Sequence, residues 1–120
     1  MPVINALSSL YHPTQILADL LTLCETYSNP FVPLALSSLR GLTVTWIGDS
    51  NNILNDMILA FPRLGIHLRI ATPKGYNLDK NVLALSTELT KSEGGEGKVF
   101  HCNDPVEALQ GTDVIVTDTW

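Results

Sequence analysis

Residues 42–52 read LTVTWIGDSNN, and this stretch decides the fold class. Leu42–Ile47 is rich in β-branched and aromatic residues, which predicts a strand. Gly48 and the polar residues after it predict a tight turn. Apolar residues then recur at helical spacing from Asn52 to Leu64, so we expect a helix. A strand that leads through a glycine turn into a helix is the first half of a βαβ unit.

The same alternation continues toward the C-terminus. It predicts strands over His67–Ala71, Lys98–His101 and Asp113–Thr117, a helix over Asp79–Lys91, and a short helix from Asp104 to Gly111. Strands separated by helices imply right-handed crossovers and a parallel sheet. We therefore predict an α/β fold with a parallel Rossmann-like sheet of about four strands in the order 3-2-1-4 and flanking helices.

Prolines mark two breaks in the pattern. Pro62 falls in the last turn of the first sheet helix, where a proline costs about 3 kcal/mol, so we expect that helix to end or kink near Ala60. Residues 28–41 contain two prolines, several polar residues and a closing glycine without any periodicity. They predict a linker between domains.

Another helix is expected before this linker. Pro13 suits a first helical turn, and apolar residues follow at i, i+1, i+4 and i+5 spacing until Tyr27. We predict three parts: the end of one domain with an interdomain helix (1–27), the linker (28–41) and the first part of a second domain (42–120). Met1–Asn5 has no basic flank of a targeting peptide and looks like the interior of a strand.

Composition excludes several classes of protein. Twelve acidic and seven scattered basic residues give a net charge of -5, which argues against a nucleic acid partner. No apolar run approaches the roughly 18 residues of a membrane span. Cys24 and Cys102 lack the spacing of metal ligands, so we expect two reduced, partly buried thiols and no metal site.

His12 and Gln15 are the first candidate site residues. His12 precedes a proline at the mouth of the predicted helix, and Gln15 lies three residues later. The helix start favours an anionic or carbonyl-bearing ligand, to which a neutral imidazole can donate and an amide oxygen can offer an acceptor. A capping box, in which Gln15 folds back on the helix start, is the structural alternative.

The ends of the predicted strands carry further candidates. Ligands bind such sheets beyond the carboxyl ends of the strands, which selects Gly48–Asn52, Thr72–Tyr76 and Asp118–Trp120. The asparagine amides suit the backbone groups of an amino acid, although an asparagine helix cap explains them equally well. Asp118 can pair with a substrate ammonium group or cap a loop. We expect His67 and His101 to be packed or surface residues.

These segments together resemble the ornithine carbamoyltransferases, within the aspartate/ornithine carbamoyltransferase superfamily. His12-Pro13-Thr14-Gln15 is similar to their His-Pro-x-Gln motif. Residues 46–52 (WIGDSNN), 71–76 (ATPKGY) and 117–120 (TDTW) follow in the family's order. The first motif also fits aspartate carbamoyltransferases, whereas residues 46–52 and 117–120 favour the ornithine enzymes.

The resemblance implies a reaction and roles for these residues. His12, as the catalytic residue, and Gln15 would bind the carbamoyl group of carbamoyl phosphate, and residues 1–27 would end that substrate's domain. Asn52 and Asp118 would bind L-ornithine, whose δ-amine attacks the carbamoyl carbon to give citrulline and phosphate. The family serves arginine biosynthesis and the urea cycle, needs no metal or organic cofactor and is usually a homotrimer. Its members occupy the mitochondrial matrix in animals and the cytoplasm in bacteria.

Two other interpretations compete with an active enzyme. A dehydrogenase nucleotide-binding module would have G-x-G-x-x-G after the first strand, but this loop has the single glycine Gly48. The second is a truncated, non-catalytic carbamoyltransferase relative. It is suggested by the absence of the family's Ser-x-Arg-Thr phosphate loop, its Ser-Met-Gly loop and its His-Cys-Leu-Pro motif.

We expect that the 120-residue chain, made alone, does not synthesise citrulline, because it has little with which to hold a phosphate dianion. A colorimetric citrulline assay on the purified chain checks this expectation. Turnover above a control without protein would contradict it.

Overall fold

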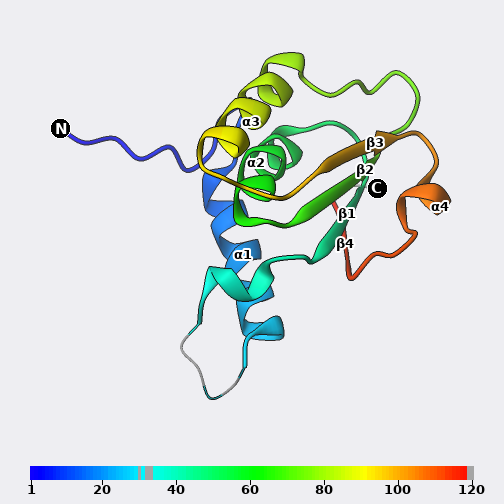
Figure 1. The fold of residues 1–120 in the computed structure, drawn as a ribbon. Helices are drawn as coiled ribbons and strands as arrows, with labels where there is room; N and C mark the ends of the chain where they lie inside the picture. The colour runs from blue at the N-terminus through cyan, green and yellow to red at the C-terminus, as the bar shows by residue number, and fades with distance from the viewer. Residues whose placement is uncertain (30, 32–33, 119–120) are drawn as a thin grey trace.

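A four-stranded parallel sheet organises the part of the chain that the computed structural model describes, residues 1–29, 31 and 34–118. The strands are β1 (Thr43–Ile47), β2 (His67–Ala71), β3 (Val99–Cys102) and β4 (Val114–Thr117). They lie in the order β3-β2-β1-β4 (Figure 1). The predicted α/β class and strand order are therefore confirmed.

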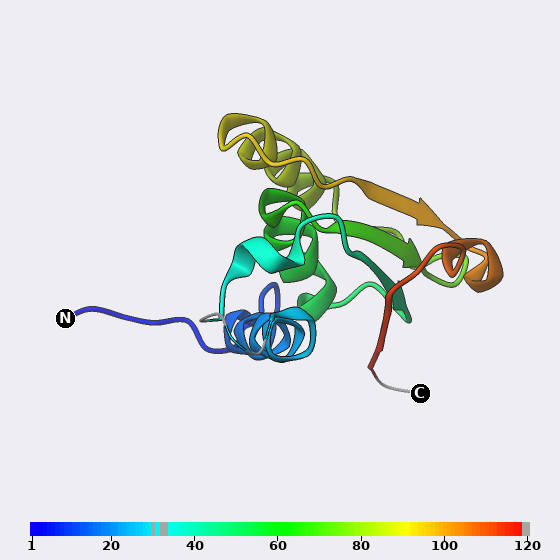
Figure 2. The same cartoon turned by 60° about the horizontal axis from the view of Figure 1, so that its bottom comes forward.

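Helices cover the two faces of this sheet unequally. They are α1 (Pro13–Tyr27), α2 (Asn52–Ala60), α3 (Lys80–Ser92) and α4 (Pro105–Ala108), with short 3₁₀ helices η1 (Leu36–Leu39) and η2 (Pro62–Leu64). The first three lie on one side of the sheet, and α4 lies on the other (Figure 2). Thr45 and Arg69, from β1 and β2, both donate hydrogen bonds to the carbonyl of Ala108 and so attach α4 to that face.

The core lies between the central strands and α2. Val44 pairs with Leu68 and Trp46 with Ile70 across β1 and β2, and all four are fully buried. Leu54, Met57, Ile58 and Phe61 fill the space above them, also without exposure. Each such side chain stabilises the fold by about 1.5–3 kcal/mol relative to an exposed position. This packing fixes α2, and therefore the start of α2 beside the ends of the strands.

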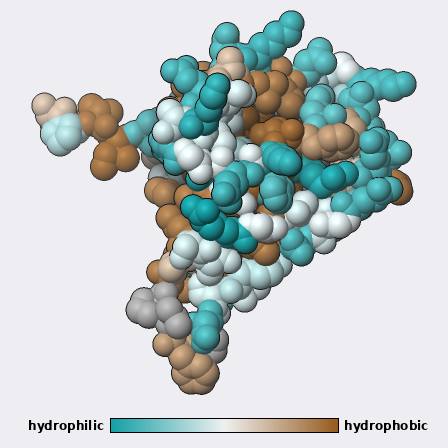
Figure 3. Space-filling view, in the orientation of Figure 1, coloured by the Kyte–Doolittle hydropathy of each residue, from teal (hydrophilic) through white to brown (hydrophobic). Residues whose placement is uncertain are grey.

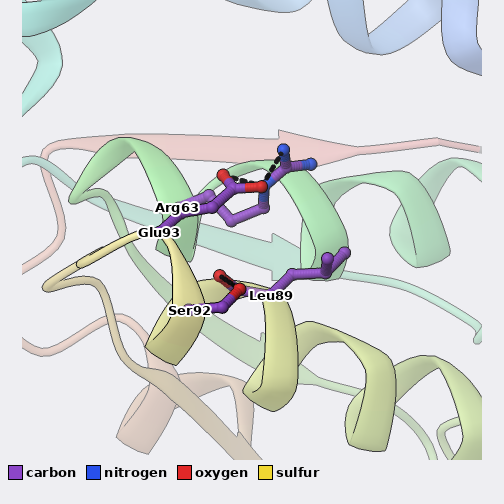
Figure 4. A network of polar contacts seen from close by, with 4 residues as sticks. All are labelled: Arg63, Leu89, Ser92 and Glu93. Carbon is purple, nitrogen blue, oxygen red and sulfur yellow. Dashed lines mark hydrogen bonds and ion pairs between the residues drawn. The ribbon is translucent and has the colours of Figure 1, made fainter.

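The break at Pro62 occurs where it was predicted. α2 ends at Ala60, η2 begins at Pro62, and Gly65 closes the turn with a φ of 78° that favours glycine. Arg63 donates two hydrogen bonds of 2.7 Å to the Glu93 carboxylate at the end of α3. Figure 4 shows this pair beside the Ser92 hydroxyl, which donates to the carbonyl of Leu89. The pair is partly exposed, so it contributes at most about 1 kcal/mol.

One expectation upstream is wrong, and one short element was not foreseen. The first residues form no strand, because no neighbouring strand offers them hydrogen bonds, and Val3 and Ile4 project into solvent as part of an extended tail (Figure 1). The predicted linker is not wholly irregular, because it contains η1, whose Leu39 is fully buried against the core. The division into residues 1–27, 28–41 and 42–120 stays a prediction.

α1 packs on α2 and leaves part of its own surface uncovered. Ile16, Leu20 and Leu23 face the core, whereas Leu17 and Leu21 are more than half exposed. Apolar surface therefore runs along α1 and continues onto the N-terminal tail (Figure 3).

Candidate active site

The carboxyl ends of all four strands surround one cavity of about 530 Å³. Its lining comes from the strand ends and the loops after them: Ile47, Gly48, Asp49, Ala71, Thr72, Pro73, Tyr76, Asn103, Pro105 and Thr117. Two of the three predicted ligand-binding loops thus contribute directly, and Asp118 of the third follows Thr117. Thr119 and Trp120, the end of the TDTW segment, lie outside the described residues.

Asn51 connects the first of these loops to the end of β4. Its side-chain oxygen accepts hydrogen bonds from the backbone N–H groups of Ile53 and Leu54, both at 3.1 Å, and so caps α2. Its amide nitrogen donates to the Asp118 carboxylate at 2.9 Å. The cap and the polar site are therefore compatible, because the cap uses only the oxygen of the amide. Asn51 is thus the asparagine of this loop that contacts Asp118, and the predicted roles of Asn52 and Asp118 in binding ornithine stay predictions.

Asn52 faces the N-terminal segment instead. Its amide nitrogen donates to the carbonyl of Ser8 at 2.9 Å. One turn later, the Asn55 amide donates to the carbonyl of Leu10 at 3.1 Å, and the Asp56 carboxylate accepts the backbone N–H of His12. We call Asn52, Asn55 and Asp56 the polar face of α2. It holds residues 8–12 at the edge of the sheet that carries Asn51 and Asp118.

Gln15 points along α1 and does not fold back on the helix start. Its amide nitrogen donates to the Asp19 carboxylate at 2.8 Å, and His12 makes no side-chain cap. The capping-box alternative is therefore wrong. A carboxylate can only accept hydrogen bonds, so Asp19 takes the NH₂ group of Gln15 and leaves the Gln15 oxygen free to accept from a ligand.

Two carboxylates lie close to His12: that of Asp19 on α1 and that of Asp56 on α2. Burial raises the pKa of Asp56, although the His12 backbone N–H and the nearby imidazole partly oppose this shift. Burial also raises the pKa of Asp19, against the lowering effects of the Gln15 amide and the His12 ring. Within the described residues, one oxygen of Asp19 is buried and has no hydrogen-bond partner. The surroundings of His12 are therefore acidic and partly desolvated.

The chain offers no arginine to this region. Arg40 pairs with Glu96, and Arg63 pairs with Glu93. Arg69 donates to the carbonyls of Glu107 and Ala108. These are the three arginines of the sequence, so a phosphate near His12 would meet no guanidinium from this chain.

The remaining titratable candidates are His101 and the two cysteines, which lie apart from His12 and Asp118 in the sequence. His101 lies on β3, and its ring contacts the Thr72 hydroxyl at 2.7 Å. Cys24 is buried and Cys102 is half-buried, and both are free thiols. Among the described residues, no group of three or more His, Cys, Asp or Glu side chains is arranged to hold a metal ion. Nor does any helix there have the length and apolarity needed to cross a membrane.

The geometry can be compared with known proteins. Residues 40–120 match the family model described as "Aspartate/ornithine carbamoyltransferase, Asp/Orn binding domain". The chain belongs to this family. The match covers the sheet, α2 to α4 and the loops that line the cavity.

Whole-chain relatives agree with the family match. The chain is 47% identical to a protein of Gallus gallus named "Ornithine transcarbamylase, mitochondrial" and covers 31% of it. It is 41% identical to the mitochondrial ornithine carbamoyltransferase of Aspergillus terreus and covers 33% of that protein. In both comparisons all 120 residues of this chain align. The chain thus spans about a third of the length of these relatives.

Solved structures match the fold over the full chain. The mitochondrial ornithine carbamoyltransferase of Coccidioides immitis superposes with a TM-score of 0.87 at 36% identity, and this chain covers 37% of it. The Giardia lamblia ornithine transcarbamoylase superposes with a TM-score of 0.85 at 28% identity, and this chain covers 40% of it. The superposition therefore includes α1 as well as the sheet.

Sequence reasoning missed the residues that connect the two halves of the site. Asn55, Asp56 and Asp19 were not among the predicted site residues, and Asn51 was covered only as part of the Gly48–Asn52 loop. Asn51 carried a recognisable signal, because it directly precedes a predicted helix. Asp56 carried no such signal, because it lies with Asn52 and Asn55 on the side of the helix away from Leu54 and Met57. The partners of both are 44 or more residues away, beyond the reach of any local pattern.

Replacing Asn51 tests its role as the cap of α2. Asn51→Ala removes the cap of α2, so we expect the free energy of unfolding to fall by about 1 kcal/mol. Asn51→Ser keeps a capping oxygen, and we expect it to restore most of this loss. Urea denaturation of the three proteins gives the comparison. Equal losses in both variants, or none in Asn51→Ala, would contradict the assignment of Asn51 as the cap.

Proposed function

We propose that this chain is the central part of an ornithine carbamoyltransferase, which converts carbamoyl phosphate and L-ornithine to citrulline and phosphate. One observation carries the proposal: the segment with His12 and Gln15 is bonded, through Asn52 and its neighbours on α2, to the edge where Asn51 meets Asp118. Two sets of polar groups suited to two substrates thus lie on neighbouring elements, in a family named for carbamoyl transfer.

His12 and Gln15 suit the carbamoyl group. A neutral imidazole N–H can donate to the carbamoyl oxygen and stabilise the negative charge that develops there during attack. The free Gln15 oxygen, oriented by Asp19, can accept from the carbamoyl NH₂ group. The two contacts would orient the carbamoyl carbon toward the second substrate, which lowers the entropic part of the barrier.

Asn52 and Asp118 suit the amino acid end of ornithine. The Asp118 carboxylate is exposed and can pair with an α-ammonium group, and asparagine amides can donate to an α-carboxylate. The δ-amine of ornithine then attacks the carbamoyl carbon, the bond from this carbon to the phosphate oxygen breaks, and the attacking nitrogen loses a proton. Asn52 uses one amide hydrogen for the carbonyl of Ser8, which leaves the second amide hydrogen to donate to ornithine, whereas Asn51 already donates to Asp118.

The same proposal covers the whole protein. Residues 1–27 would end the carbamoyl phosphate domain and residues 42–120 would begin the ornithine domain, in a homotrimer of arginine biosynthesis or the urea cycle. The names of relatives from Gallus gallus and Aspergillus terreus include "mitochondrial", which supports a matrix location if the source is an animal. The absence of arginine near His12 supports a phosphate site completed by residues other than those in this chain.

Binding of L-ornithine to the isotopically labelled chain tests the proposal. We expect L-ornithine at millimolar concentrations, equivalent to about -4 kcal/mol, to shift the side-chain amide signals of Asn51 and Asn52 in NMR spectra. L-Aspartate, the matched control ligand, should leave them unchanged. Asp118→Asn removes the charge opposite the α-ammonium group and should weaken ornithine binding at least tenfold.

Asp104→Asn serves as the control variant, because Asp104 caps α4 and asparagine caps equally well. This variant should bind ornithine like the parent chain. Equal shifts with aspartate would favour the aspartate branch of the family, and no shifts with ornithine would refute the proposed assignment.

A further inference from the structure

The backbone N–H of His12 is held from outside its own helix. His12 is the residue before the first turn of α1, where the helix offers no acceptor for its N–H group. Pro13 follows and has no N–H to contribute. The acceptor comes from a distant part of the sequence, because the Asp56 carboxylate on α2 accepts this hydrogen bond.

The other side of His12 is fixed by α1 itself. Its carbonyl accepts from the backbone N–H of Gln15 at 3.1 Å and of Ile16 at 3.4 Å. Because both peptide groups of His12 are bonded, the direction of its Cα–Cβ bond is set. The direction in which the imidazole leaves the chain therefore depends on the contact with Asp56.

Asp56 occupies an unfavourable place for a carboxylate. Only 9% of the residue is exposed, because the residues before α1 cover the polar face of α2 on which it lies. A buried charge with few donors is often less stabilising than an apolar residue of similar size. The benefit of an aspartate here is consequently geometric, since it fixes a backbone group that no other described residue holds.

We propose that Asp56 is a positioning residue for His12: its carboxylate fixes the turn from which the His12 and Gln15 side chains project. The consequence for catalysis rests on the proposed function, but the contact itself does not. Asp56 touches neither substrate in this account and acts through the backbone of His12.

The charged neighbours of Asp56 define the necessary controls. The imidazole of His12 lies close to it on the N-terminal segment, and Asp19 faces the same imidazole from α1. Asp19 bonds to Gln15 and not to the backbone N–H of His12. Asp19→Asn is therefore the matched control, since it removes a nearby carboxylate of similar environment without removing the proposed contact.

The experiment follows the amide proton of His12 by NMR in the 120-residue chain between pH 3 and pH 7. A charge-assisted hydrogen bond is stronger than a neutral one, so ionisation of Asp56 should shift this proton downfield. Burial raises the pKa of Asp56, and the midpoint of the shift is therefore expected above 3.8, the ordinary value. Asp56→Asn, which preserves shape and an accepting oxygen, should abolish this step. The Asp19→Asn variant should retain it.

The outcomes test the positioning role of Asp56 and the proposed carbamoyltransferase function separately. An absent step in the parent chain, or a step that survives in Asp56→Asn, would overturn the proposal, and the first measurement requires no variant to fold. L-Ornithine is added in parallel at neutral pH. If it leaves the side-chain amide signals of Asn51 and Asn52 in the parent chain unshifted, the proposed function fails, whereas the amide titration of His12 still decides the role of Asp56.

Discussion

The hydrogen bonds between the polar face of α2 and residues 8–12 are the constraint on which the candidate site depends. Residues 8–12 belong to no strand or helix, so their backbone groups have no regular partners. Asn52, Asn55 and Asp56 supply three partners within one turn of α2. This contact places the start of α1, with His12 and Gln15, beside the carboxyl edge of the sheet.

α2 can position the start of α1 because one of its sides packs on the sheet and another carries polar residues. Leu54, Met57, Ile58 and Phe61 pack on β1 and β2 and fix the helix against the sheet. Helical spacing places the polar face on another side, directed at the chain before α1. The cap by Asn51 completes the arrangement, because it joins the first residues of α2 to Asp118. A single nine-residue helix thus connects the sheet, the His12 turn and the end of β4.

The fold was largely predictable because its signals are local. Glycine turns, helical spacing and short β-branched runs located the strands, and their alternation with helices predicted the parallel, Rossmann-like sheet whose strand order is observed. The break at Pro62 followed from proline chemistry alone. The strand expected near Val3 was wrong, since an apolar run forms a strand only where another strand pairs with it.

The site was less predictable because its contacts are distant in sequence. His12 and Gln15 could be selected from a helix start, and Asp118 from the end of a strand. Which of two adjacent asparagines meets Asp118 depends on the capping geometry of Asn51, and the role of Asp56 depends on how α1 docks. Neither is encoded in local spacing, and both lie on the connection between the two halves of the site.

Native-state hydrogen exchange at the His12 amide tests most directly whether α2 holds this turn. If the polar face fixes residues 8–12, this amide exchanges as slowly as the hydrogen-bonded amides of α2, because both are released by the same opening. Exchange as fast as that of the exposed amides of Val3 and Ile4 would show that the turn is not held and would contradict the account.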